Sequence, residues 1–112
     1  MSSTPRITLN DGTSIPQLGF GTLNVPPDRQ PTPENTRKTA EVVGLALELG
    51  YRHIDTAQSY GNERGVGDAI AAAGIPRDEL YVTSKLGNGN HRPDDVRRSF
   101  DETLEKLGLE RL

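Results

Sequence analysis

The sequence predicts an α/β fold in which a β-hairpin is followed by parallel strands joined by crossover helices. Two observations support this prediction. Segments in which apolar residues alternate are followed by segments in which they recur every three or four positions, and this strand–helix order occurs three times in the 112 residues. Proline, glycine or a capping residue marks most of the changes from one pattern to the other. Repeated strand–helix order favours parallel strands with right-handed connections.

The first elements are a short hairpin over residues 6–16 and a strand over residues 17–22. Ile7 and Leu9 alternate with polar neighbours, and the Asn-Asp-Gly turn at 10–12 contains residue types that accept a positive φ. The strand that follows is rich in glycine, which allows another backbone or a ligand to approach closely.

A first helix is expected from about Thr32 to Leu49, after a proline-rich loop. Thr32 suits the N-cap, Pro33 suits the first helical position, and Gly50 suits the end of the helix. Its apolar spacing predicts a buried face made of Val42, Val43, Ala46 and Leu49.

Two further strand–helix pairs follow. Strands are expected over 51–56 and 80–85, and helices over 62–74 and 93–108. The last helix begins with proline and two aspartates and ends at a glycine, as the preferences of helix ends require. Its predicted buried face contains Val96, Phe100, Leu104 and Leu107.

The predicted organisation is therefore a hairpin at 6–16 and three βα units at 17–50, 51–74 and 80–108. An α/β barrel needs eight strands and typically about 250 residues. Only 32% of the residues are hydrophobic, which is low for a self-sufficient core. We interpret residues 1–112 as the first part of a larger barrel whose remainder is missing.

The composition excludes several classes of function. The net charge of −3 gives no reason to expect nucleic acid or an anionic membrane as a partner. The sequence leaves the oligomeric state open. The sequence contains no cysteine, which excludes disulfides and thiolate metal sites and favours the reducing cytoplasm. No secretory leader or membrane-spanning stretch is expected.

Common ligand motifs do not match. The stretch GVGDAI lies inside a predicted helix and departs from the dinucleotide pattern at Ile70. His53 and His91 lack the spacing of metal ligands, so no metal site is expected. His53 is interpreted as an interior histidine and His91 as a loop residue. Glu63 and Arg64 are expected on solvated helix surface.

Three polar residues occupy positions where α/β barrels carry their chemistry. Asp55 ends the second predicted parallel strand, Tyr60 follows in the next loop, and Lys85 ends the third strand. Working residues of such barrels lie at the carboxyl ends of strands and in the loops after them. Alternation along the strands predicts that His53 and Asp55 share one face, as do Tyr81, Thr83 and Lys85.

Together, these residue types can form a proton donor. A tyrosine ordinarily has a pKa of about 10, and a nearby lysine ammonium favours the phenolate form. An aspartate beside the lysine holds it in place and offsets its charge. Such a tyrosine can protonate a carbonyl oxygen while a hydride reaches the carbon. Taken singly, the aspartate is better explained as a turn or capping residue, the tyrosine as packing, and the lysine as a solvated strand end. Taken as a trio at the predicted rim, the catalytic and the structural explanations carry about equal weight.

The stretches LNDGTSIPQLGFGT (9–22), GYRHIDTAQSYGNERGVG (50–67) and LYVTSKLGN (80–88) occur in the order and spacing of one known family. The second stretch resembles the signature of the aldo/keto reductase family. The first resembles that family's hairpin and first barrel strand, and the third resembles its lysine-bearing third strand. DRQPTPENT (28–36) resembles an extension of the loop after the first strand. The matching signature positions are Gly50, Tyr51, Arg52, Ile54, Asp55, Thr56, Ala57, Glu63, Val66 and Gly67.

The resemblance implies a (β/α)8 TIM barrel, plugged by the hairpin, that reduces small aldehydes or ketones with NADPH. It implies that Tyr60 is the proton donor and that Lys85 and Asp55 tune it. It places Gly21, Thr22 and Asp55 beside the nicotinamide ribose. Asn62 and Glu63 would be structural.

Two departures from the family pattern affect the expected site. Leu23 and Gly87 stand where the family commonly has aromatic walls of the substrate pocket. The family's catalytic histidine would lie beyond Leu112, as would the loops that hold the adenine and its 2′-phosphate. The isolated chain is therefore expected to be inactive. The alternative function is that of a non-catalytic barrel fragment, which would act, if at all, through a partner or through self-association.

Overall fold

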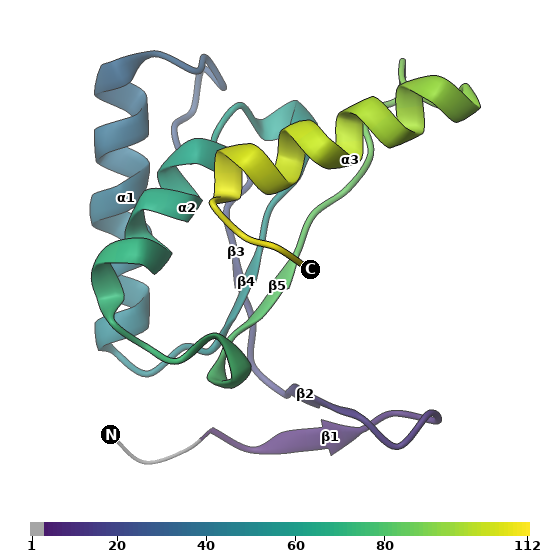
Figure 1. Cartoon of the computed structure of the whole chain (residues 1–112). Coiled ribbons are helices and arrows are strands. Elements are labelled where there is room, and N and C mark those ends of the chain that lie inside the picture. The colour runs from purple at the N-terminus through teal and green to yellow at the C-terminus, as the bar shows by residue number, and fades with distance from the viewer. Residues whose placement is uncertain (1–3) are drawn as a thin grey trace.

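The computed structural model describes residues 4–112, which form two small sheets and three α-helices (Figure 1). The first sheet pairs β1 with β2 in antiparallel orientation, and the second contains β3, β4 and β5 in parallel orientation with β4 in the centre. The strands are β1 (Arg6–Thr8), β2 (Ser14–Pro16), β3 (Phe20–Gly21), β4 (His53–Asp55) and β5 (Tyr81–Thr83).

A helix follows each parallel strand, as the sequence predicts. α1 (Pro33–Glu48) contacts α2 (Glu63–Ala73), and α2 contacts α3 (Pro93–Leu107). The helices gather on one side of the sheet (Figure 1). Two short 3₁₀-helices, η1 (Gln58–Tyr60) and η2 (Arg77–Glu79), lie in the connections.

The parallel sheet has different environments on its two faces. Ile54 of β4 is opposite Phe20 and Val82, and both Ile54 and Val82 are buried in the core shared with the helices. Asp55 is opposite Gly21 and Thr83 and is only partly buried. Because successive side chains of a strand point to opposite faces, the polar residues at this end of the sheet share the face away from the core.

The two ends of the sheet also differ. The β1–β2 hairpin lies at the end where the parallel strands begin, and the strands run away from it (Figure 1). Their carboxyl ends therefore meet at the opposite end, where the loops into the helices are located.

α1 begins as the sequence predicts, but its buried face differs from the expectation. The Thr32 side chain accepts a hydrogen bond from the Asn35 amide, and Gly50 has a positive φ of 106° just beyond the helix end. The prediction that Val42 and Leu49 are buried is wrong, because the face toward α2 and the sheet follows positions three and four residues apart that leave these two side chains outside it. The buried residues of α1 are Thr39, Val43, Ala46 and Leu47.

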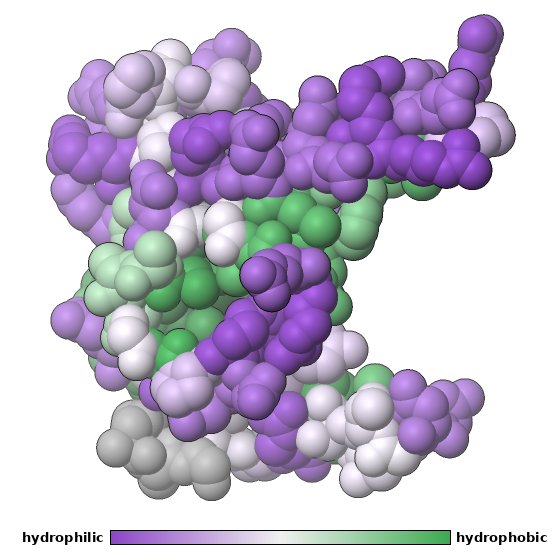
Figure 2. Space-filling view, viewed as in Figure 1, coloured by the Kyte–Doolittle hydropathy of each residue, from purple (hydrophilic) through white to green (hydrophobic). Residues whose placement is uncertain are grey.

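The buried face of α3 also differs from the prediction. Leu107 is buried, but Val96 is 39% exposed and Phe100 is 47% exposed. The helix turns Ser99 and Thr103 inward instead, while Val96 and Phe100 lie beside the chain that follows the edge strand β5. Apolar surface is visible beneath α3 in the space-filling view (Figure 2). The sequence pattern correctly identified an apolar stripe but not how much of it this chain covers.

Candidate active site

Asp55, Tyr60 and Lys85 meet at the carboxyl end of the parallel sheet. Asp55 is the last residue of β4, and Lys85 follows β5 by two positions. The pairing of Asp55 with Thr83 brings the end of β5 alongside Asp55. Tyr60 is the last residue of η1, the single turn between β4 and α2. The structure thus brings together the three residues that the sequence singles out.

The Lys85 ammonium is the centre of this cluster. Its Nζ donates hydrogen bonds to both carboxylate oxygens of Asp55, at 2.9 Å and 2.8 Å, and to the Thr56 carbonyl at 3.0 Å. It also donates to the Tyr60 hydroxyl at 3.4 Å. One cation therefore links a carboxylate to a phenol across two strands and a loop.

Asp55 and Lys85 hold each other in their charged forms. Burial raises the pKa of Asp55, but hydrogen bonds from Lys85 and Thr83 outweigh it, so this pKa lies below its ordinary value of 3.8. Burial likewise lowers the pKa of Lys85, but the bonds to Asp55 and Tyr60 outweigh it, so this pKa lies above 10.5. The Asp55 side chain is 33% exposed and that of Lys85 is 50% exposed. Solvent therefore weakens the contribution of this ion pair to the free energy of unfolding.

This pairing predicts a pH-dependent contribution of Asp55 to stability. The native pKa of Asp55 lies below the ordinary value of 3.8, which applies to the unfolded chain. The stabilisation is therefore complete above pH 3.8 and is lost as the pH falls from there through the native pKa. The difference in unfolding free energy between the wild type and Asp55→Asn should therefore shrink below about pH 4. Urea unfolding of both proteins between pH 2 and pH 7, roughly the range that spans this transition, would measure it. A difference that stays constant over this range would contradict the prediction.

Thr83 and His53 extend the cluster along the same face of the sheet. The Thr83 hydroxyl donates to Asp55 Oδ1 at 2.6 Å, and His53 Nε2 lies 3.3 Å from the same hydroxyl oxygen. Burial lowers the pKa of His53 below its ordinary value of 6.5. The sequence predicted an interior histidine at position 53 and Thr83 on the face of Lys85, but it did not indicate their contacts with the cluster.

Asn62 fixes the loop that carries Tyr60. Its side-chain amide donates to the carbonyls of Thr22 and Val25, at 2.9 Å and 2.7 Å, and its oxygen accepts from the Thr56 hydroxyl. It thereby ties the loops after β3 and β4 together. Such a buried amide, satisfied by two carbonyls and one hydroxyl, stabilises one loop geometry.

Glu63 differs from the expectation of a solvated residue. It is 3% exposed and accepts a hydrogen bond of 2.6 Å from Ser84, next to Lys85. The expectation fails because Glu63 occupies the first turn of α2, directly beneath the loop after β5. Arg64, by contrast, is 55% exposed and pairs with Glu105.

The residues expected beside a cofactor line the end of β3. Gly21 pairs with Asp55 across the sheet, and a Cβ at position 21 would meet no atom of residues 4–112 within 4 Å. The Thr22 side chain is fully buried, and its hydroxyl donates to the Asp55 carbonyl at 2.9 Å. Leu23 is exposed. The open surface at this point is therefore formed by positions 21 and 23, and Thr22 supports it from within.

Gly87 lies in the loop between β5 and α3, where Gln58 holds it. The Gln58 side chain accepts a hydrogen bond of 2.6 Å from the Gly87 amide and donates one of 3.1 Å to the Ser99 carbonyl. A Cβ at position 87 would lie 3.2 Å from Gln58 Oε1, so a larger residue there would have to displace this clamp.

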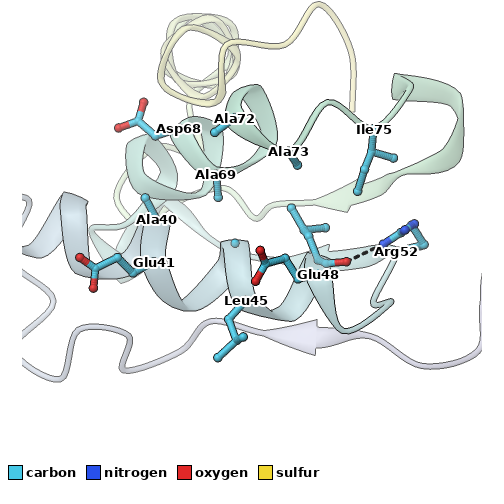
Figure 3. A pocket seen from close by; sticks show the side chains of 12 residues that line it. Ala40, Glu41, Leu45, Glu48, Arg52, Asp68, Ala69, Ala72, Ala73 and Ile75 are labelled. Atoms are coloured by element: carbon cyan, nitrogen blue, oxygen red, sulfur yellow. Dashed lines mark hydrogen bonds between the residues drawn. The ribbon is translucent and has the colours of Figure 1, made fainter. Parts of the chain in front are cut away.

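Two cavities differ in their relation to the cluster. A cavity of about 150 Å³ lies next to it, and its lining includes Lys85, Leu86, Val96 and Phe100. A larger cavity, of about 710 Å³, lies between α1 and α2 (Figure 3). In the larger cavity, Arg52 donates to the Leu47 carbonyl, and the lining contains none of the predicted site residues.

Residues 4–112 contain no cluster suited to a metal ion and no helix suited to a membrane span. No group of three or more histidine, cysteine, aspartate or glutamate side chains in this range is arranged to hold a metal ion. None of the helices in the same range is long and apolar enough to cross a membrane.

Comparison with known proteins agrees with the sequence resemblance. The model of the aldo/keto reductase family matches residues 17–112. A D/L-glyceraldehyde reductase of Hypocrea jecorina is 41% identical over 117 positions, which cover 100% of this chain and 33% of that protein. An aldo-keto reductase of Mycolicibacterium smegmatis is 43% identical over 96% of this chain and 36% of its own length.

Solved structures confirm the fold class. The Bombyx mori aldo-keto reductase in complex with NADP is similar with a TM-score of 0.82 and 40% identity, over 98% of this chain and 36% of that chain. An aldo/keto reductase from Brucella melitensis is similar with a TM-score of 0.82 and 42% identity, over 96% of this chain and 39% of that chain. The fold is thus part of a TIM barrel.

The chain spans about a third of the length of the curated relatives that it matches. The family model nevertheless covers most of the chain, including β3, β4, β5 and the Asp55–Tyr60–Lys85 cluster. The chain belongs to the aldo/keto reductase family.

Proposed function

We propose that these residues serve in an NADPH-dependent reductase of small aldehydes or ketones, in which Tyr60 donates the proton. The observation that carries this proposal is the Lys85 ammonium, which is bonded to the Asp55 carboxylate at 2.8 Å and to the Tyr60 hydroxyl at 3.4 Å. The similarity to a protein named D/L-glyceraldehyde reductase supports a carbonyl substrate, and a related structure in complex with NADP supports the cofactor.

The residues at the end of β3 and β4 fit the nicotinamide end of NADPH. The space beside Gly21 is open. Asp55 is partly exposed, and among residues 4–112 its Oδ2 atom accepts a hydrogen bond only from Lys85. Asp55 would accept from a ribose hydroxyl there, and the backbone at Gly21 and Thr22 would lie against the ribose. The bound cofactor would supply the hydride.

The proton step follows from the charges of the cluster. A carbonyl oxygen near Tyr60 gains negative charge as its carbon is reduced, and the phenol O–H gives its proton to that oxygen. Lys85 stabilises the phenolate that remains. Asp55 keeps the ammonium in position, so that its charge is already directed at the phenol before reaction.

The substrate pocket would be bounded by Leu23 and Gly87. Leu23 offers an exposed aliphatic wall, and Gly87 adds no side chain next to the Gln58 clamp. We propose a pocket more open than one with aromatic residues at these two positions. We further propose that residues 1–112 are the N-terminal part of the barrel, with a hairpin and three βα units, and that the cytoplasm is its compartment.

A second candidate function rests on the uncovered apolar surface near α3. Leu86, Val96 and Phe100 are exposed around the 150 Å³ cavity, and β5 is at the edge of the sheet. An edge strand with adjacent apolar side chains can associate with another chain. In this case the chain would be a non-catalytic fragment that acts through a partner or through self-association.

The isolated 112-residue chain tests which parts suffice for turnover. We expect no NADPH-dependent reduction above background with a panel of aldehydes, because the proposed site needs groups beyond these residues. Loss of NADPH absorbance would measure it, with the Hypocrea jecorina D/L-glyceraldehyde reductase assayed in parallel as the positive control. Turnover by the purified chain would show that the proposed dependence on further residues is wrong.

A further inference from the structure

We propose that Thr83 and His53 are positioning residues, which fix the Asp55 carboxylate in the orientation that receives Lys85. They lie on the same sheet face as Asp55, and Thr83 is its partner in the strand register. Their importance for catalysis rests on the proposed function, whereas the positioning itself is a property of this chain.

The direction of each hydrogen bond follows from the hydroxyl of Thr83. A hydroxyl has one proton to donate, and Thr83 gives it to Asp55 Oδ1 at 2.6 Å. The contact of 3.3 Å between His53 Nε2 and Thr83 Oγ1 must then be donated by the imidazole. The structure assigns the proton of the neutral His53 ring to Nε2, which makes a directed chain from His53 through Thr83 to Asp55.

The His53 ring has little freedom to leave this arrangement. A Cβ at position 19 would lie only 2.9 Å from His53 Nδ1, so the glycine there leaves the room that the ring occupies. The Tyr81 ring lies edge-on, with a centroid distance of 5.2 Å and an interplanar angle of 68°. Gly19, just before β3, and Tyr81 of β5 thus confine the imidazole where Nε2 meets Thr83.

The consequence for Asp55 is a fixed carboxylate plane. Oδ1 accepts from both Thr83 and Lys85, while Oδ2 accepts from Lys85. A carboxylate can rotate about its bond to Cβ, and the short Thr83 bond selects one rotation. Both carboxylate oxygens are then directed at the Lys85 ammonium, which in turn reaches Tyr60.

The decisive experiment compares Thr83→Val with Thr83→Ser in the 112-residue chain. Valine keeps the shape of threonine without the hydroxyl, and serine keeps the hydroxyl. Carbon-detected NMR titration of the Asp55 carboxyl group should show that its acid dissociation constant falls about tenfold in Thr83→Val and stays within about twofold of wild type in Thr83→Ser. Thr39→Val, the same change at a buried threonine of α1, is the control and should leave the constant unchanged.

Nitrogen NMR of the His53 ring supplies an independent test. The proposal requires the Nε2–H tautomer in the wild type, and finding the proton on Nδ1 would overturn it. Gly19→Ala keeps every polar group but displaces the ring, so the Asp55 dissociation constant should fall about threefold. An Asp55 titration unchanged in both Thr83→Val and Gly19→Ala would also overturn the proposal. None of these measurements needs turnover. Their outcome therefore tests the positioning of Asp55 independently of the proposed reaction.

Discussion

Replacing Tyr60 by phenylalanine in a barrel-length protein that carries these residues should lower kcat for aldehyde reduction by about 10²- to 10⁴-fold. The substitution removes one oxygen, the hydroxyl to which Lys85 Nζ donates at 3.4 Å. Lys85 keeps its bonds to Asp55 and Thr56, so the rest of the cluster stays in place. Steady-state kinetics with NADPH and an aldehyde would measure the loss, and cofactor titration should show unchanged binding.

Tyr51→Phe is the matched control for this substitution. Tyr51 packs edge-on against Phe20, at a centroid distance of 5.4 Å, and precedes β4 at the opposite end from Asp55. The same loss of a hydroxyl there should change kcat by less than about twofold. If Tyr60→Phe keeps its activity within a few-fold of wild type, another group must donate the proton and the proposed role of Tyr60 is wrong.

The sequence was sufficient for the elements whose signals are local. Thr32 and Pro33 mark the start of α1, and Gly108 follows the end of α3 with a positive φ of 68°. Strand alternation also places His53 and Asp55 on one face of β4, with the buried Ile54 between them on the other. These features depend on residues a few positions apart, so a single sequence contains the information that defines them.

Contacts between distant segments were harder to predict. Glu63 has the appearance of a surface residue in the first turn of a helix, yet the loop after β5 covers it and Ser84 satisfies it. The link from His53 through Thr83 to Asp55 joins residues about 30 positions apart. A residue type alone does not show which of its possible partners the fold brings near.

The exposed stripe of α3 illustrates a different limit. Val96 and Phe100 recur at helical spacing, which correctly indicates an amphipathic helix. Their exposure depends on what lies beyond β5, the edge of the sheet. Periodicity tells which face of a helix is apolar, while burial depends on the neighbours that are present.

Gly67→Ala should destabilise the chain by about 1–3 kcal/mol, because α2 and α3 touch at this glycine. A Cβ at position 67 would lie 2.5 Å from the Leu107 carbonyl oxygen and 2.6 Å from that of Lys106. Both neighbours are backbone atoms at the end of α3, and they cannot turn aside as a side chain can. The two helices would have to separate, which would loosen the Leu107 contact with the core. Urea unfolding of the 112-residue chain would measure the change.

Gly44→Ala is the matched control and should have the opposite sign. Gly44 lies inside α1, where a Cβ would meet no atom of residues 4–112 within 4 Å. Alanine there should raise the unfolding free energy by about 0.5–1 kcal/mol, because it reduces the backbone freedom lost on folding. Alanine at position 67 should reduce the same backbone freedom, because Gly67 also lies inside a helix. A lower unfolding free energy in Gly67→Ala would therefore be due to the clash between α2 and α3. If Gly67→Ala were as stable as Gly44→Ala, the close approach of α2 to α3 at this glycine would be wrong.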